Sequence, residues 1–238
     1  MLASGSGVPV LLLSAILTPM ALSPAFLLIR KWKLTAVVAT SVLSISFALL
    51  LRCTLLVAKG AHVVEVYPVE PRLGLIELEC DGFNMVFADT VALPSLTVAL
   101  YSGDYMQRQS GPGFYFLLFV IYVSAMIGAV TSGSLMTFYL FFELMLLPST
   151  VLIALWGTGE SRKAAYKYFL FNETGGLITT LGMALLYDNF GVLSFDALRA
   201  KLSFISPYEL LPIAALLSAG PMVKPVSYTH LRAHETVL

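Results

Sequence analysis

The sequence predicts an all-α, multi-pass membrane protein of about seven transmembrane helices. Hydrophobic residues make up 58% of its 238 residues and charged residues only 12%, whereas a soluble domain carries roughly 25% charged residues. Long apolar stretches, each near the ~20 residues that cross a bilayer, alternate with short polar segments. These stretches indicate that the chain is surrounded by the lipid bilayer. The formal net charge is zero, so no binding to nucleic acid is suggested.

Seven apolar stretches are expected to cross the membrane as helices. The first is long enough to span the bilayer and stay there, and it lacks the basic region that precedes a cleavable signal peptide. The predicted spans are residues 8–29, 34–58, 82–101, 114–131, 135–156, 164–187 and a seventh from about residue 210 onward.

Two connecting segments are expected to carry structure of their own. Residues 59–81 alternate valine, isoleucine and leucine with charged residues, which is the period of β-strands. This pattern predicts a small β-hairpin at the membrane surface, between the second and third spans. Residues 188–209 contain a stretch with helical spacing that begins near Ser194 and Asp196, two residue types that cap helices, so a short surface helix is expected there.

The fifth span, Leu135–Trp156, carries a single acid, Glu143. At ~1.5 Å per residue, Glu143 lies ~12 Å below the start of the helix, near the middle of the hydrocarbon core. A charge there costs about 3 kcal/mol on insertion scales, so an intramembrane acid is a functional-site candidate. Pro148 should kink this helix and free the carbonyl of Leu144. The structural alternative is an acid that only pairs with a neighbouring helix.

Lys224 is the predicted partner of Glu143. It lies in the seventh span between Pro221 and Pro225, and two prolines four residues apart are expected to break a regular helix. Broken helices with buried charges line ion paths in transporters, and we expect the two charged groups to lie within about 10 Å of each other, close enough for electrostatic coupling. In the alternative interpretation Lys224 ends the helix and its ammonium reaches the membrane surface.

Three further charged residues lie within predicted spans. Lys167 is about one turn into the sixth span and either relays protons or extends to the membrane surface. Glu173 lies nearer the middle of that span, about 120° around the helix from Lys167. Gly175 and Gly176, which follow it, permit a close approach of another helix. Glu173, and Asp89 in the third span, are weaker candidates: each is either part of an ion path or a core carboxyl group with its own partner.

Several other chemistries lack the residues that they need. All three histidines lie outside the predicted spans, which argues against a membrane haem. There is no P-loop and no HExxH motif, and the two cysteines make no zinc or iron–sulfur cluster. We therefore expect no cofactor and no metal in this chain. Cys53 lies in a span and Cys80 in a loop, so the two are not expected to pair.

Two stretches carry a resemblance to a known family: FFELMLLPSTVLIALWG at residues 141–157 and RKAAYKYFL at residues 162–170. They resemble the proton-translocating membrane subunits of respiratory complex I, the M-type subunit (chain 4) above all. The same superfamily includes the D-type subunit of the Mrp-type Na⁺/H⁺ antiporters. The resemblance implies an antiporter-like fold with Glu143 and Lys224 as the coupled pair. It also implies that Lys167 matches a basic residue common at the start of the sixth helix.

The resemblance further implies that the chain works beside other membrane subunits, and that electron transfer from NADH or a related donor to quinone occurs in separate subunits. Glu173 and Asp89 stand where the family has neutral residues, so no role is implied for them. The family fold has about twice as many helices, built as inverted repeats. Residues 1–225 are therefore expected to form at most the first repeat of an antiporter-like domain, and residues 226–238 are interpreted as a non-native tail.

Three functions remain open. The first is a proton-translocating membrane-arm subunit of an NADH, or related donor, quinone oxidoreductase. The second is a subunit of a multi-subunit cation/proton antiporter, and the third is a passive structural membrane subunit. The distribution of lysine and arginine among the loops places the N-terminus outside, and a prokaryotic cell membrane is the expected location.

Overall fold

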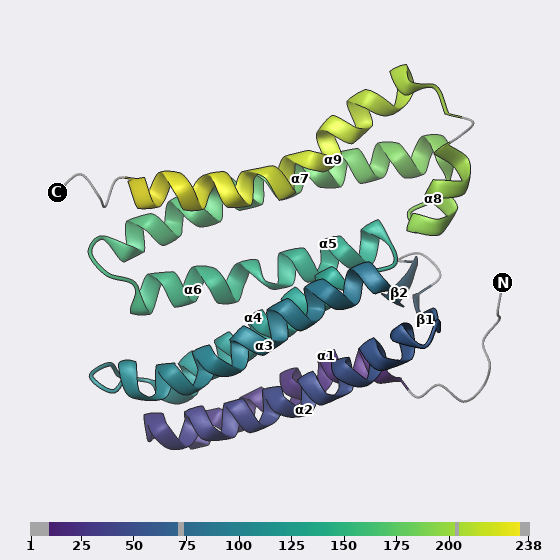
Figure 1. The fold of residues 1–238 in the computed structure, drawn as a ribbon. Helices are drawn as coiled ribbons and strands as arrows, with labels where there is room; N and C mark the ends of the chain where they lie inside the picture. Colours follow the sequence, from purple (N-terminus) through teal and green to yellow (C-terminus); the bar gives the residue numbers. More distant parts are fainter. Residues whose placement is uncertain (1–9, 71–73, 203–204, 234–238) are drawn as a thin grey trace.

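The computed structural model describes residues 10–70, 74–202 and 205–233 (Figure 1). Within these ranges the chain is helical apart from one antiparallel hairpin, which lies between the second and third spans as predicted. The elements in chain order are α1 (Leu11–Leu22), the 3₁₀ helix η1 (Ser23–Leu28), α2 (Trp32–Ala58), β1 (Val63–Glu70), β2 (Gly74–Cys80), α3 (Gly82–Tyr105), α4 (Pro112–Val130), α5 (Leu135–Leu144), α6 (Leu146–Trp156), α7 (Ser161–Phe190), α8 (Phe195–Leu202) and α9 (Pro207–Ala233).

Six helical segments are long and apolar enough to cross a membrane: α1 with η1, α2, α3, α4, α5 with α6, and α7. A shorter apolar stretch, Pro207–Val223, lies in α9 at the place of the seventh predicted span. Large apolar side chains such as Phe83, Leu93 and Leu177 are exposed on these helices, as expected for surfaces that face lipid. The chain is thus an integral, multi-pass membrane protein.

The helix α4 forms the centre of the N-terminal part of the bundle. It contains no charged residue, and it packs against α1, η1, α2, α3, α5 and α6. A helix that is apolar on all sides is stable only when neighbours surround it. Gly113 and Gly128 allow the closest of these contacts, because a side chain at either would overlap the backbone of η1 or the ring of Phe141.

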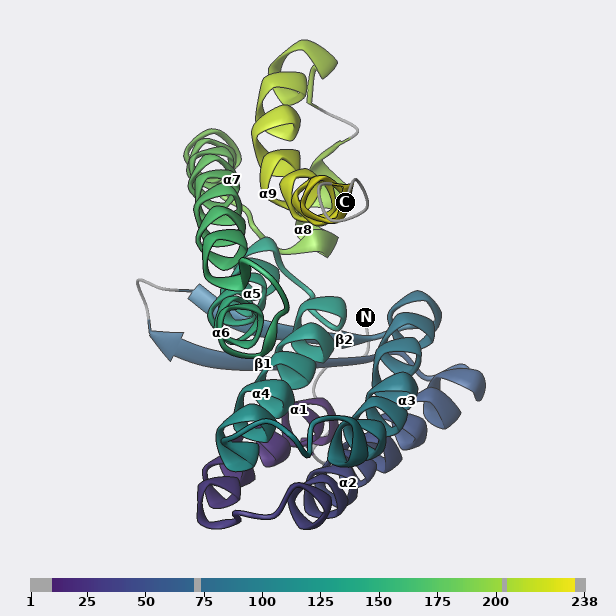
Figure 2. The ribbon, with the colours of Figure 1, turned by 90° about the vertical axis from the view of Figure 1, so that its left-hand side faces the viewer.

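The hairpin spreads across one end of the bundle (Figure 2). Its two strands pair with Val63 opposite Cys80 and Tyr67 opposite Ile76. On β1, partly buried residues alternate with exposed ones, which is the pattern that predicted the strand. On the other strand, the amide of Glu79 donates to the carbonyl of Thr131 at 2.7 Å, so the hairpin is also joined to the connection between α4 and α5.

One carboxylate ties the hairpin to the first span. Glu65 accepts hydrogen bonds from the backbone amides of Leu12 at 2.9 Å and Leu13 at 3.0 Å, at the N-terminus of α1. A carboxylate at a helix N-terminus accepts hydrogen bonds from amides that have no partner within the helix, and its negative charge interacts favourably with the helix dipole. Tyr67 donates to the same carboxylate at 2.8 Å. Burial and the hydrogen bond to Glu65 raise the pKa of Tyr67 well above its usual range, so it remains a neutral donor.

The opposite end of the bundle is joined by two indole groups. Trp32 donates to the carbonyl of Gln109 at 2.8 Å, and Trp156 donates to the carbonyl of Ser110 at 3.2 Å. These bonds bring the connections after η1, α3 and α6 to the same end of the molecule, so the N-terminus of α1 and the hairpin lie at one membrane face and these three connections at the other.

Replacing Glu65 by Gln should destabilise the protein by about 1 kcal/mol, because one backbone amide of α1 would face an amide nitrogen in place of an acceptor oxygen. Thermal unfolding of the detergent-solubilised chain measures the effect. Asp188→Asn is the matched control, because Asp188 is exposed and the substitution removes one negative charge as Glu65→Gln does. It should leave the melting temperature unchanged. Equal melting temperatures for the two variants would contradict the anchoring role of Glu65.

Candidate ion-translocation site

Glu143 lies where the fifth span bends. The span is divided at Met145 into α5 and α6, three residues before Pro148. Because Pro148 has no amide hydrogen, the carbonyl of Leu144 has no helical donor. The hydroxyl of Ser149 donates to the carbonyls of Met145 at 2.8 Å and Leu146 at 2.9 Å, at the start of α6. The predicted kink beside the acid is confirmed.

The carboxyl group of Glu143 lies against α7 at Gly176. A methyl group on Gly176 would overlap Oε1 of Glu143, and it would lie 3.4 Å from the hydroxyl of Tyr139. Tyr139, one turn before Glu143, interacts with the side chains of both Glu143 and Thr180. The acid of α5 therefore sits in a notch that a glycine leaves in α7, with a tyrosine and a threonine beside it.

The preceding residue, Gly175, faces α9. A methyl group on Gly175 would lie 3.2 Å from the Cα of Gly220 and 3.2 Å from the Cβ of Val223. Successive residues of a helix point about 100° apart, so the two glycines admit α5 and α9 at the same height on adjacent sides of α7. The predicted close approach at these glycines is confirmed, and the structure assigns each of them to a different neighbour.

The predicted break of the seventh span is wrong, because α9 continues through Pro221 and Pro225 to Ala233. Pro221 leaves the carbonyl of Leu217 without its helical donor. The buried hydroxyl of Thr179, from α7, donates to this carbonyl at 3.4 Å and accepts from the amide of Gly220 at 2.8 Å. A neighbouring helix thus satisfies the freed backbone groups, and α9 bends along its length (Figure 1).

Lys224 follows Val223 in α9. Its side chain lies outside the residues that the structure describes, so the distance to Glu143 stays a prediction. Among the described residues α9 packs along α7, and α5 and α6 pack on α7 as well. The fifth and seventh spans thus share α7 as a neighbour.

The weaker candidates on α7 occupy different environments. Lys167 is exposed, and its charge acts on Glu160, in the connection before α7. Glu173 is partly buried and acts electrostatically on Tyr139. The structure therefore brings Glu173 toward the Glu143 group and leaves Lys167 near the end of its helix.

Asp89 belongs to another part of the bundle. Its Oδ2 accepts a hydrogen bond from Thr54 of α2 at 2.8 Å. Its Oδ1 is buried and has no hydrogen-bond partner among the residues described. The third span contacts α2 and α4, so Asp89 does not join Glu143.

Tyr139, Thr179 and Thr180 were missed in the sequence, although the first two carry a recognisable spacing. Tyr139 lies four residues before Glu143, and that spacing places both on one face of a helix. Thr179 lies four residues after Gly175, the small-residue spacing that is typical of close contacts between membrane helices. Both signals were present in the sequence, but each acquires meaning only when the partner helix is known.

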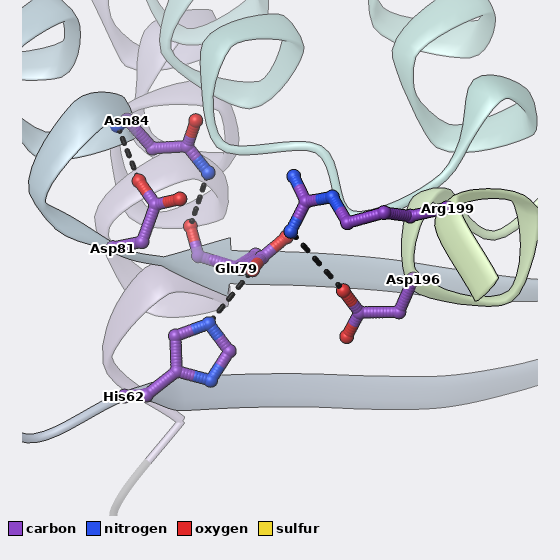
Figure 3. A network of polar contacts seen from close by, with 6 residues as sticks. All are labelled: His62, Glu79, Asp81, Asn84, Asp196 and Arg199. Carbon is purple, nitrogen blue, oxygen red and sulfur yellow. Dashed lines mark hydrogen bonds and ion pairs between the residues drawn. The ribbon is translucent and has the colours of Figure 1, made fainter. Parts of the chain in front are cut away.

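A second polar cluster lies at the hairpin end (Figure 3). His62 contacts the carboxylate of Glu79 at 2.7 Å, and Asn84 donates from its side chain to the carbonyl of Glu79 and from its amide to Asp81. Glu79, Asp81 and Arg199 also line a cavity of about 410 Å³. The cluster fixes the hairpin to the start of α3, at the end of the bundle and away from Glu143 in its interior.

The spans, the hairpin and the acid at a helix kink define a multi-pass membrane protein with an ionisable group inside its helix bundle. Residues 132–229 match the family model described as "NADH:quinone oxidoreductase/Mrp antiporter, TM". This part of the chain, which contains Glu143 and Lys224, is similar to that family, and the resemblance noted in the sequence is confirmed.

Curated relatives come from both branches of the family. The chain is 33% identical over 173 residues to NAD(P)H-quinone oxidoreductase chain 4 2 of Thermosynechococcus vestitus, a match that covers 71% of this chain and 32% of the relative. It is 28% identical over 159 residues to the D-type Na⁺/H⁺ antiporter subunit of Bacillus subtilis, with coverage of 67% and 32%. The chain thus spans about a third of the length of these relatives.

Solved structures show the same fold. The chain superposes on the Mrp complex from Dietzia sp. DQ12-45-1b with a TM-score of 0.78 and 23% identity, over 90% of this chain and 24% of that one. It superposes on the membrane-bound sulfane sulfur reductase, an archaeal respiratory membrane complex, with a TM-score of 0.75 and 20% identity, over 91% and 33% of the two chains.

Replacing Thr179 by Val should leave the amide of Gly220 and the carbonyl of Leu217 without their side-chain partner, at a cost of about 1–3 kcal/mol. Hydrogen–deuterium exchange of the peptide that contains Gly220 should accelerate at least about fivefold. Thr174→Val is the isosteric control, since Thr174 is exposed and bonds only within α7. Unchanged exchange in the Thr179 variant would show that α9 does not depend on this hydroxyl.

Proposed function

We propose that this chain is an ion-translocating membrane subunit in which Glu143 and Lys224 are the coupled pair through which protons move. The observation that carries the proposal is the pair of glycines on α7. Glu143 meets α7 at Gly176, and Val223, the neighbour of Lys224 in sequence, meets it at Gly175. In this proposal the two charged residues project from α5 and α9 at the same depth along α7.

The energy of such a pair depends strongly on small movements. At an effective dielectric constant of about 20, opposite unit charges attract by about 4 kcal/mol at 4 Å and by about 1.7 kcal/mol at 10 Å. The difference of about 2.5 kcal/mol changes proton affinity by more than tenfold. A shift of α9 relative to α5 along their common neighbour would thus be enough to load or release a proton.

The polar groups around Glu143 suggest how the path continues. Tyr139 and Thr180 provide hydroxyl groups along the α5–α7 contact, and Glu173 adds a second carboxyl group that acts on Tyr139. In this proposal Lys167, near the exposed end of α7, supplies the basic residue on the access side. Asp89, with its bond to Thr54, has a separate role in the packing of α2 and α3.

We infer that the subunit belongs to the membrane arm of an NADH, or related donor, quinone oxidoreductase, with NADH and quinone handled by partner subunits. The 33% identity to an oxidoreductase chain 4, against 28% to a D-type antiporter subunit, supports this choice. Residues 1–225 would be the antiporter-like domain, and residues 226–238 a non-native tail. The other two candidates are a subunit of a multi-subunit cation/proton antiporter, which the likeness to an Mrp complex supports, and a passive scaffold.

Replacing Glu143 by Gln in the complete subunit, assembled with its membrane partners, should lower donor-driven proton uptake into inverted vesicles at least about tenfold. Glutamine keeps the shape of the side chain but cannot exchange a proton. Glu160→Gln is the matched control, because Glu160 is exposed in a connection and its loss should leave uptake unchanged.

The outcomes of this measurement separate the three functions. Loss of NADH-driven proton uptake with intact assembly supports the oxidoreductase subunit. Loss of proton movement driven only by a Na⁺ or K⁺ gradient supports the antiporter. Unchanged transport in an assembled Glu143 variant would support the passive scaffold and would contradict the proposed role of the pair.

We also propose that the N-terminus and the hairpin face outside, in a prokaryotic cell membrane. The opposite end carries the basic residues Arg30, Lys31 and Arg108 in its connections and Arg162 and Lys163 in the first turn of α7, and basic residues at span ends favour the cytoplasmic side.

In a background with both native cysteines changed to serine, a membrane-impermeant maleimide should label Ala61→Cys in intact cells and should not label Ser110→Cys. Both positions are exposed, and they lie at opposite ends of the bundle. Both variants should react once the cells are broken open, which controls for protein amount. The reverse labelling pattern would invert the proposed orientation.

A further inference from the structure

The structure places Cys53 and Cys80 together, although the sequence argued against their pairing. Cys53 lies near the end of α2 and Cys80 is the last residue of β2. Both are in the core, with exposed fractions of 2% and 0%. Both belong to the same buried cluster and their side chains interact with each other, and the sulfur of Cys80 also lies 3.6 Å from the sulfur of Met85. Both cysteines are reduced in the structure.

Regular elements hold this pair in place on both sides. The strand β2 contacts α2, and Leu78, which precedes Cys80 on the same face of the strand, is fully buried. Asp81, directly after Cys80, caps α3 by accepting from the amide of Asn84 at 2.6 Å. The chain around Cys80 is thus fixed between a strand and a helix, and the contact with Cys53 follows from the packing of the hairpin on the bundle.

We propose that Cys53 and Cys80 form an intramolecular disulfide that ties the hairpin to α2. One thiolate attacks the disulfide of a thiol oxidant, a protein or a small molecule, and the second cysteine displaces the oxidant's sulfur from the mixed disulfide. Two S–H bonds are lost and one S–S bond forms. The two electrons and two protons pass to the oxidant, whose disulfide becomes two thiols.

The location of the pair favours its oxidation. The bonds from Glu65 to the start of α1 place the hairpin at the same membrane face as the N-terminus of α1. If this face lies outside, as proposed above, the pair forms in a compartment where disulfides persist. Because both side chains are buried, exchange takes place before the hairpin packs on α2. The packed hairpin then protects the bond from reduction.

The sequence offers a direct test. Trypsin cleaves after Arg52, Lys59, Arg72 and Arg108, so each cysteine falls in a separate peptide, residues 53–59 and residues 73–108. Membranes that contain the chain, prepared without reductant, are quenched with acid, denatured and alkylated before digestion. We expect the two peptides to be joined in more than half of the molecules, and to separate after reduction with dithiothreitol.

Two variants provide the controls. Cys53→Ser and Cys80→Ser should each lack the joined peptide and carry one alkylated cysteine. Dithiothreitol should lower the melting temperature of the unmodified chain and leave that of Cys53→Ser unchanged. Alkylation of both cysteines in nearly all molecules of the unmodified chain would overturn the proposal. None of these measurements involves ion transport, so their failure would leave the proposed role of Glu143 untouched.

Discussion

The contact between the carboxyl group of Glu143 and the bare backbone at Gly176 sets the geometry of the C-terminal half of the bundle. An ionisable group in hydrocarbon costs about 3 kcal/mol or more unless protein groups replace its hydration. Here the absence of a side chain at Gly176 of α7 allows the carboxyl group to approach, and Tyr139 lies beside it. Any larger residue at Gly176 would push α5 away from α7. The position of Glu143 in the bundle therefore depends on the glycine at position 176.

The helix α7 also accommodates α9, one residue before Gly176. Gly175 lets α9 approach, and one turn further along α7 the hydroxyl of Thr179 satisfies the backbone that Pro221 exposes. A proline in a membrane helix removes one hydrogen bond, and a polar side chain from a neighbour can compensate for it in place of water. This compensation explains why α9 bends and does not break. It also ties the position of α9 to α7 close to the site of Lys224.

The elements that depend on local patterns were predictable from the sequence. Apolar stretches near 20 residues gave the spans, strand periodicity gave the hairpin, and Pro148 gave the kink beside Glu143. The features that depend on packing between distant segments were not. The rescue of α9 by Thr179 and the meeting of Cys53 with Cys80 require knowledge of which surfaces face each other, and single-sequence periodicity does not contain it. The order of neighbours around α7 belongs to the same class.

The hairpin and the Glu143 site are mechanically linked through α5. The hairpin holds the N-terminus of α1 through Glu65, and its strand β2 bonds to the connection that leads into α5: Gly133 donates to the carbonyl of Glu77 at 2.8 Å, and the amide of Glu77 donates to the hydroxyl of Thr137 at 2.9 Å. The start of α5 is thereby fixed, whereas its far end opens into the kink at Met145. In the proposed mechanism, a change in the separation of Glu143 and Lys224 would then come from the kink or from α9, since the hairpin end of α5 cannot shift without breaking these bonds. The proposed charge pair, which would work by small changes in separation, needs one fixed element and one movable element, and the hairpin would supply the fixed one.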